Sequence, residues 1–332
     1  MYDIITIGSN TVDIFAHTDK SQLINIQSKD RREEFISYPV GGKLLITKLL
    51  MNFGGNGANT AVCFSRLGFK TGYVGEVGGD VNGKLIMNNL KREKISFLGS
   101  RGGKDSTSGY SIILDAMEDD RTILVYKGCN NDMRTDELKL SKLNSRWFYI
   151  SSMLGASLKT MEKLADYARQ KKILIAFNPS ATIIENEPQA TMKLARYAEI
   201  LVLNKEEAEG LIGKESVEVN LLKLSALGPK VVVITDGKKG STGLYKGYYY
   251  KITPRKGLHI VETTGAGDAF ASTLTAGFIM KKPFEQCLKM AVNNSESVIS
   301  NHGAQNHLLI RKEMLTIMAK DKRIVEKRKA QC

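Results

Sequence analysis

The chain has 332 residues, of which 42% are apolar and 25% charged, a composition that excludes a mainly disordered protein. Its 48 Lys and Arg outnumber its 35 Asp and Glu, so the net charge is +13. No apolar run reaches the roughly 18 residues that cross a bilayer, and the first ten residues resemble no signal peptide, so we expect a cytoplasmic protein without a membrane partner. Four well-separated cysteines predict neither a disulfide framework nor a thiolate metal site.

Short β-branched or aromatic runs alternate with helical patterns along most of the chain. Strands are predicted at residues 3–7, 72–77, 147–150, 173–177, 200–203 and 231–235, and helices at 58–67, 84–94, 158–169, 206–211, 217–227, 266–280 and 284–300. This alternation is typical of a three-layer α/β/α fold, in which helices cover both faces of a mostly parallel central sheet. Ligands bind such sheets beyond the carboxyl ends of the strands.

Two regions interrupt the alternation. Residues 14–50 contain no clear helix, and residues 95–129 are predicted to form strands at 109–114 and 121–126 around a turn at 118–120. Together the two regions predict a small inserted β-sheet, which could act as a lid over a site.

The charge excess is concentrated at the end of the chain. Residues 311–332 hold eight Lys and Arg against three Asp and Glu, which is +5 of the +13. Such a tail can bind nucleic acid, but it has no aromatic residues for stacking on bases, and its apolar residues recur at helical spacing. We therefore favour a solvated terminal helix with a frayed end, after a single domain at residues 1–310, and do not expect a nucleic-acid partner.

Residues 78–85 nearly match a phosphate-binding P-loop. Leu85, however, stands where a Ser or Thr hydroxyl must bind Mg²⁺. We expect a turn and the start of a helix there instead.

The most informative motif is Thr-Thr-Gly-Ala-Gly-Asp at residues 263–268, directly before an apolar helix. The glycines let backbone N–H groups converge, and these groups form an anion site together with the helix dipole. Asp268 would repel a bound phosphate, but it could accept the proton of a hydroxyl that attacks a phosphoryl group. The alternative is a helix cap, with Thr264 as N-cap and Asp268 complementing the dipole. The motif alone leaves both open.

A second glycine loop, at residues 52–61, opens the helix predicted at 58–67. Its glycines permit close approach to a small polar ligand, and Asn59 offers a donor and an acceptor to hydroxyl groups. Asp13 adds a carboxylate that could accept hydrogen bonds from a diol. A tight turn with a capped helix remains the alternative.

Four motifs, in order, resemble those of the ribokinase-like (phosphofructokinase-B type) family of sugar and nucleoside kinases. They are the glycine pattern from Gly54 to Gly78, Asn-Lys-Glu-Glu at 204–207, Thr-Asp-Gly-Lys-Lys-Gly at 235–240, and the motif at 262–270. The resemblance covers roughly residues 3–310. It implies a three-layer fold with a lid, and an enzyme that uses ATP and Mg²⁺.

The resemblance also implies a role for each matching position. Asp268 would be the general base, and Glu207 would act on Mg²⁺ through ordered water. The developing charge would be held by the N–H groups of Gly265, Ala266 and Gly267. The nucleotide would be contacted by Asn204, Thr235, Gly237, Gly240 and Asn293, and the phosphate acceptor by Asp13, Gly55 and Asn59.

Four positions depart from the family pattern, among them Ala176, which precedes Phe177-Asn178-Pro179 where many members have an Asp two residues before the Asn. Glu262 stands where the family usually has Asp beside a K⁺ site, so activation by K⁺ is open, and we favour weak or absent activation. Thr273 stands where a Gly or Ala is usual. Asn56 replaces the Lys common in ribokinases proper, which weakens the case for free ribose.

Our interpretation is a kinase that phosphorylates a primary hydroxyl of a sugar, with a possible homodimer formed through the lid. A nucleoside kinase of the same family is the alternative within this class. From a different class, the chain could be a catalytically silent binding protein on the same fold. The intact motif at residues 265–268 argues against that.

Overall fold

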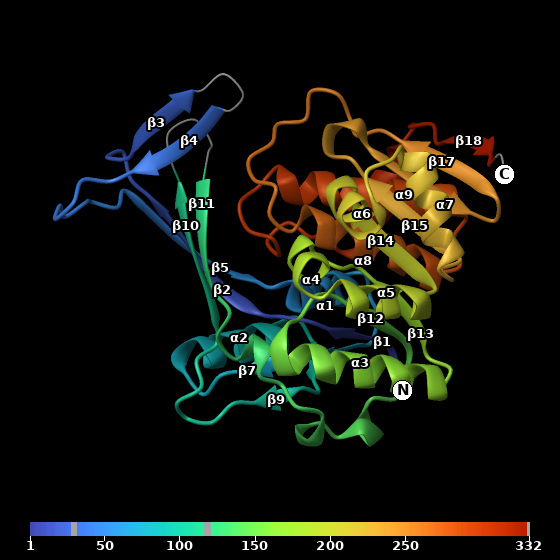
Figure 1. Ribbon diagram of the computed structural model, residues 1–332, viewed down its shortest axis with the longest axis horizontal. Helices are drawn as coiled ribbons and strands as arrows, with labels where there is room; N and C mark the ends of the chain where they lie inside the picture. Colours follow the sequence, from blue (N-terminus) through green and yellow to red (C-terminus); the bar gives the residue numbers. More distant parts are fainter. Residues whose placement is uncertain (28–31, 116–120, 331–332) are drawn as a thin grey trace.

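The alternation of strands and helices builds a large α/β body, from which a β-sheet lid projects (Figure 1). This computed structural model describes residues 1–27, 32–115 and 121–330. The body is a central sheet covered by helices on both faces, which confirms the predicted three-layer α/β/α fold.

Ten strands form the central sheet, in the order β18-β17-β16-β15-β14-β13-β12-β1-β6-β8. Neighbouring strands from β8 to β15 are parallel. The three pairs at the other edge, β15–β16, β16–β17 and β17–β18, are antiparallel. The strands are β1 (Tyr2–Ile7), β6 (Thr71–Val74), β8 (Ser96–Phe97), β12 (Ser145–Ile150), β13 (Leu174–Phe177), β14 (Ile200–Asn204), β15 (Val231–Thr235), β16 (Ser241–Tyr245), β17 (Tyr248–Ile252) and β18 (Glu326–Lys329). The sequence patterns missed β16, β17 and β18, because none of them is a continuous apolar run: their sequences are STGLY, YYYKI and EKRK.

The strand predicted at 72–77 is divided in two. After β6 the chain passes Gly75, and β7 (Glu76–Val77) then pairs with β9 (Ser100–Arg101) in a separate small sheet. The Ser100 N–H donates to the Gly75 carbonyl at 3.1 Å, which holds the two segments together.

Successive strand residues point to opposite faces, so each face of the sheet has its own core. One core packs against α1 (Asn56–Arg66), α2 (Val81–Arg92), α8 (Ala266–Ile279), α9 (Phe284–Ile299) and α10 (Arg311–Lys320). The other packs against α3 (Gly155–Gln170), α4 (Ala181–Asn186), α5 (Pro188–Tyr197), α6 (Lys205–Ile212) and α7 (Val217–Ala226). The short helices α4 and α5 were not predicted. Within the described ranges, no helix combines the length and apolar character needed to cross a membrane.

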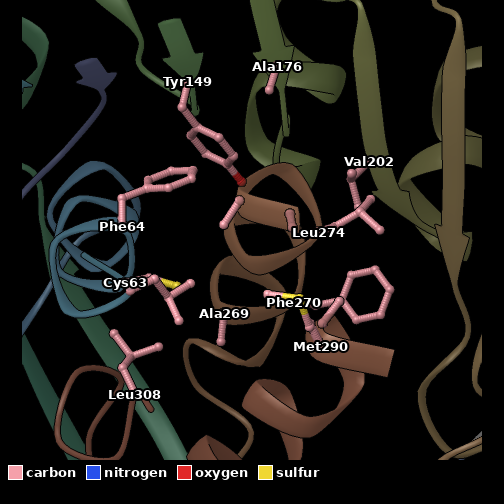
Figure 2. Close-up of a cluster of buried hydrophobic side chains, with 14 of the residues drawn as sticks. Cys63, Phe64, Tyr149, Ala176, Val202, Ala269, Phe270, Leu274, Met290 and Leu308 are labelled. Carbon is pink, nitrogen blue, oxygen red and sulfur yellow. The ribbon is translucent and has the colours of Figure 1, made fainter. Parts of the chain in front are cut away.

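A compact core joins α1 to α8 beneath the ends of the sheet strands (Figure 2). The rings of Phe64 and Tyr149 meet edge to face at 5.5 Å. Thr273 forms part of a buried polar cluster, since its hydroxyl accepts from Asn294 Nδ2 at 2.7 Å and lies 3.3 Å from the Cys63 sulfur. This cluster explains why a hydroxyl residue occurs at a position that is usually small.

The predicted lid is a four-stranded sheet in the order β11-β10-β2-β5. Its strands are β2 (Thr11–His17), β5 (Lys48–Gly54), β10 (Gly109–Asp115) and β11 (Arg121–Tyr126). A hairpin of β3 (Gln22–Gln27) and β4 (Arg32–Ser37) lies at its far end (Figure 1). The turn predicted at 118–120 lies outside the described residues. Because β5 runs directly into α1, the lid is continuous with the first glycine loop.

The C-terminal segment corrects one expectation. The terminal helix is present as α10, but the residues after it are not a frayed end, because β18 pairs with β17 at the sheet edge. Arg323 Nη1 lies 2.8 Å from a carboxylate oxygen of Glu296, and Arg328 Nη2 lies 2.6 Å from one of Glu218. These basic residues therefore serve as ion-pair partners within the fold.

Candidate active site

Helix α8 begins directly after Gly265, whose φ of 79° lies in the left-handed region. No side chain caps the helix, so Thr264 is not the N-cap that the alternative interpretation of this motif required. The Ala266 N–H donates to the Thr263 carbonyl at 3.2 Å and is therefore engaged. In contrast, a Cβ added to Gly267 would meet no described atom within 4 Å, so the helix opens onto free space at this residue.

Asp268 lies in the first turn of α8 and faces Asn59 of α1. Asn59 Nδ2 donates to Asp268 Oδ2 at 2.8 Å. The surrounding protein shields the carboxylate from water and raises the pKa of Asp268 from 3.8 to about 6, although the bond from Asn59 lowers it. Asp268 is therefore mostly ionised at neutral pH and can accept a proton there.

Asn59 has a second partner, because its Oδ1 accepts from Gln305 Nε2 at 3.0 Å. Both ends of the Asn59 amide are thus engaged by protein groups. The sequence patterns placed Asn59 in the acceptor site and did not single out Gln305. In the structure Asn59 holds the Asp268 carboxylate, and its contact with the acceptor stays a prediction.

Asp13 lies on β2 at the base of the lid and is only 7% exposed. Burial raises the pKa of Asp13, while hydrogen bonds from Ser111 and Thr11 lower it. A side chain at Gly54 would overlap the Asp13 carboxylate, and one at Gly55, where φ is 88°, would strike the backbone between β1 and β2. These glycines therefore allow segments of the chain itself to pack closely.

Asn204 and Glu207 form a capping box at the start of α6. The Asn204 N–H donates to Glu207 Oε2, and the Glu207 N–H donates to Asn204 Oδ1, both at 2.8 Å. Burial raises the pKa of Glu207 to about 7, and the negative charge of Asp268 adds to this effect. The two carboxylates are therefore close enough to interact. In the described part of the chain, no three His, Cys, Asp or Glu residues are arranged to hold a metal by themselves.

The predicted nucleotide loop follows β15. Pairing of β14 with β15 places Asn204 beside Thr235, at the carboxyl ends of both strands. Gly237 has φ of 45°, and a Cβ there would meet no described atom within 4 Å. Gly240 has φ of 92°, and a side chain there would strike the Ile252 carbonyl. Only the first of these glycines therefore faces open space.

The structure does not bring Asn293 into this group. Its amide donates to Asp321 Oδ2 at 2.7 Å and to the Lys289 carbonyl at 2.8 Å, and its Oδ1 accepts from Arg255 Nη2 at 2.6 Å. The side chain thus anchors the C-terminal segment. A surface cavity of about 530 Å³ adjoins that segment, and none of the predicted site residues lines it.

Residues 23–311 match the family described as pfkB family carbohydrate kinase. A ribokinase of Bacillus subtilis is 28% identical over 96% of this chain and all of the relative.

Two solved structures illustrate the likeness in fold. Arabidopsis thaliana ribokinase, solved with ribose and ATP, has a TM-score of 0.78 at 21% identity, covering 96% of this chain and 98% of that one. A nucleoside kinase of Methanocaldococcus jannaschii has a TM-score of 0.75 at 18% identity, covering 96% and 99%. At these identities the two structures establish the fold.

Proposed function

We propose that this chain, which belongs to the pfkB family of carbohydrate kinases, transfers the γ-phosphate of ATP to a hydroxyl group of a sugar. The observation that carries the proposal is the start of α8, where a helix without a side-chain cap meets open space beside an ionised carboxylate. A helix terminus of this kind attracts an anion, but the negative charge of Asp268 would repel that anion. The carboxylate therefore needs a role other than anion binding. Accepting the proton of the attacking hydroxyl is such a role.

Different groups at the start of α8 would have different roles in phosphoryl transfer. The N–H groups of Gly265 and Gly267 and the dipole of α8 would stabilise the charge that develops on the transferred group. Asp268 would take the proton from the acceptor hydroxyl, and Asn59 keeps its carboxylate aimed. Because little deprotonation is needed early in a loose transition state, a weak base is sufficient.

The nucleotide would lie over the carboxyl ends of β14 and β15, where Asn204, Thr235 and Gly237 come together. Mg²⁺ would supply charge neutralisation for the phosphates. This ion usually takes only one or two carboxylates and keeps several waters, so a site without a cage of protein ligands fits it. Glu207 would act through such a water while its Oε2 holds the cap.

The acceptor would bind at the base of the lid beside Asp13, whose carboxylate suits hydroxyl groups. A nucleoside is the second candidate acceptor, supported by the structural likeness to a nucleoside kinase. A homodimer through the lid stays a prediction, and the exposed apolar side chains of β11 support it: Ile123, Leu124, Val125 and Tyr126.

ADP release with Mg²⁺-ATP and a panel of sugars and nucleosides tests the activity. Asp268→Asn should lower kcat on the best acceptor by on the order of 10²–10⁴, the usual contribution of a positioned base, while ATP still binds. A variant that keeps more than about half of the wild-type kcat would remove Asp268 from the mechanism. If no acceptor supports ADP release although both ligands bind, the alternative of a silent binding protein is favoured.

A further inference from the structure

The hydrogen bonds behind Asp268 continue beyond Asn59 to the molecular surface. Arg92 Nη2 donates to Asn89 Oδ1 at 2.6 Å, and Asn89 Nδ2 donates to Gln305 Oε1 at 2.9 Å. Gln305 Nε2 then donates to Asn59 Oδ1 at 3.0 Å, and Asn59 Nδ2 to Asp268 Oδ2 at 2.8 Å. We call the three middle residues, Asn89, Gln305 and Asn59, the amide chain. Each is 5% exposed, so water cannot readily replace these bonds.

A side-chain amide is a donor at one end and an acceptor at the other, and its two ends have nearly the same shape. Each amide in a row therefore dictates which end its neighbour presents. A guanidinium can only donate and an ionised carboxylate can only accept, so the groups at the two ends of the row, Arg92 and Asp268, require the same direction. If the direction were reversed, Asn59 would present its oxygen to the Asp268 carboxylate.

We propose that Arg92, Asn89 and Gln305 are positioning residues that fix the amide of Asn59 so that its NH₂ group faces Asp268. They act through Asn59 and touch neither substrate in the proposed reaction. The inference rests on the proposed role of Asp268 as the base. Its consequence is that a surface residue on α2 supports the ionised, proton-accepting form of a carboxylate on α8.

The loop that carries Gln305 is held against α2 by separate contacts. Arg66 of α1 donates through Nη1 to the carbonyls of Gln305, at 2.6 Å, and Leu308, at 3.2 Å. The same guanidinium pairs with Glu93, the residue after α2, through Nε at 3.0 Å and Nη2 at 2.8 Å. Arg66 therefore fixes the spacing between Asn89 and Gln305, by an ion pair on one side and backbone carbonyls on the other, and the amide chain need only set direction.

Electrostatics around Asp268 agree with this direction. Burial raises the pKa of Asp268, and the bond from Asn59 is the contact that lowers it. The negative charge of Asp268 also raises the pKa of two titratable groups on elements packed around α8, Glu207 of α6 and Tyr149 of β12. Neither is positively charged, so neither can take the place of the Asn59 donor.

The decisive variant is Asn89→Asp, which keeps the shape of the side chain. The new carboxylate lies beside Arg92 and stays ionised, so it can only accept. Gln305 must then donate to it and offer its oxygen to Asn59, which in turn offers its oxygen to Asp268. We expect the acidic limb of the kcat–pH profile to move up by about one pH unit, which lowers kcat below that limb roughly tenfold. The KM for ATP should stay within about twofold.

A double variant separates direction from charge. In Asn89→Asp with Gln305→Met, the negative charge remains but the amide chain is broken, so Asn59 can again donate to Asp268. Its pH profile should match that of Gln305→Met alone. If the shift of the acidic limb persists in the double variant, the charge acts through space and the proposal is wrong. An unshifted Asn89→Asp that is folded by its thermal transition also overturns it.

A surface pair keeps the test valid if Asn89→Asp does not fold. Arg92→Glu puts an acceptor in place of the terminal donor, whereas Lys91→Glu makes the same charge change at the neighbouring exposed position. We expect a shift of the acidic limb in the same direction for the first and none for the second, and equal profiles would refute the proposal. Asp268→Asn, measured in parallel, distinguishes the two levels. If it stays active, the proposed base is wrong. If it is inactive while the Asn89→Asp profile is normal, only the amide chain is wrong.

Discussion

Helices α1 and α8 begin in the same way and end up with different tasks. Each follows a glycine with positive φ, 88° at Gly55 and 79° at Gly265, and neither has a side-chain cap. Each begins within a glycine motif, Gly54-Gly55-Asn56-Gly57 at α1 and Gly265-Ala266-Gly267 at α8. On local geometry alone, both are candidate anion sites.

The surroundings distinguish the two. At α1 the chain itself fills the space, because the Ala58 N–H donates to the Ser9 carbonyl and a Cβ on Gly57 would lie 2.6 Å from the backbone of Gly8. At α8, a Cβ on Gly267 would meet no described atom within 4 Å. Glycine at α1 thus lets the backbone pack, whereas glycine at α8 leaves room for a ligand. A glycine loop in a sequence indicates a close approach to the backbone. Only the fold shows whether the approaching group is another segment of the chain or a ligand.

A pair of matched substitutions would break this comparison if it is wrong. Gly57→Ala should lower the free energy of unfolding by about 1–3 kcal/mol, because a methyl group must displace backbone. Gly267→Ala should leave stability unchanged or slightly raised, since it removes chain entropy from the unfolded state. It should instead lower kcat/KM for ATP by roughly tenfold or more, because the methyl group enters the space of the phosphate. Chemical denaturation and ADP release measure the two effects, and equal stability losses would contradict the distinction.

The ionised carboxylate of Asp268, at the open start of α8, should lower the free energy of unfolding at neutral pH. The pKa of Asp268 is raised from 3.8 to about 6 by burial, so the folded protein binds a proton more tightly than the unfolded chain. The stability associated with that proton is present below about pH 4 and is lost as the pH rises through 6. Asp268→Asn should therefore stabilise the protein at pH 8 by on the order of 2 kcal/mol, and hardly at all near pH 4. Thermal unfolding at both pH values tests this.

Asp80 provides the matched control. Asp80 caps α2 by accepting from the Gly83 N–H, and it also accepts from the Ser108 hydroxyl. Partial burial raises the pKa of Asp80, but these hydrogen bonds outweigh burial and lower it. The sign is thus opposite, because stability from Asp80 is present at neutral pH and lost as the pH falls through its folded pKa. Asp80→Asn should therefore destabilise the protein at pH 8. If both variants change stability in the same direction, the distinction between a capping and a catalytic carboxylate does not hold.

Glu207 combines both roles in one side chain, which makes its conservative variant informative. Glu207→Gln keeps an acceptor for the Asn204 N–H, so the capping box and the stability should survive. The concentration of Mg²⁺ that gives half-maximal activity should rise on the order of tenfold, the usual effect of losing a partner of metal-bound water. Titration of ADP release with Mg²⁺ measures it. An unchanged Mg²⁺ requirement would leave Glu207 with the structural role alone.

The sequence predicted the parts of this site that depend on local patterns. The parallel strands follow from apolar runs. The capping box of Asn204 and Glu207 was not predicted, although its three-residue spacing is a local signal. The contact of Asn59 with Asp268 joins residues 209 positions apart, so no local pattern contains it. Gln305 was missed for the same reason.

The edge of the sheet shows a second limit. Strand β18 is rich in charge and fully exposed, so it carries no apolar pattern that predicts a strand. It is held by backbone pairing with β17 and by Lys327, whose Nζ lies 4.6 and 5.1 Å from the ring centroids of Tyr248 and Tyr250. Whether such a segment forms a strand depends on the edge strand with which it can pair, here β17.

The smallest expected effect is that of K⁺ on activity, which depends on what holds the loop before α8 in place. The loop before α8 is pinned by the protein, because the N–H groups of Val261 and Glu262 both donate to the Ile299 carbonyl, at 2.8 and 3.1 Å. Glu262 is 4% exposed, and its Oε2 accepts from the Gly303 N–H at 2.9 Å. His302 Nδ1 lies 4.0 Å from the same oxygen. A carboxylate that is already bound to a backbone N–H needs no ion to fix the loop.

We therefore expect that replacing K⁺ by a large organic cation at constant ionic strength changes kcat by less than about twofold. Glu262→Gln keeps an acceptor for the Gly303 N–H and removes only the charge, so it should behave like the wild type in both salts. Loss of most activity without K⁺ would show that an ion orders the loop, and the same loss in Glu262→Gln would identify the carboxylate that holds it. In that case a bound cation would hold the open start of α8 in place, whereas the start of α1 is held by the chain alone.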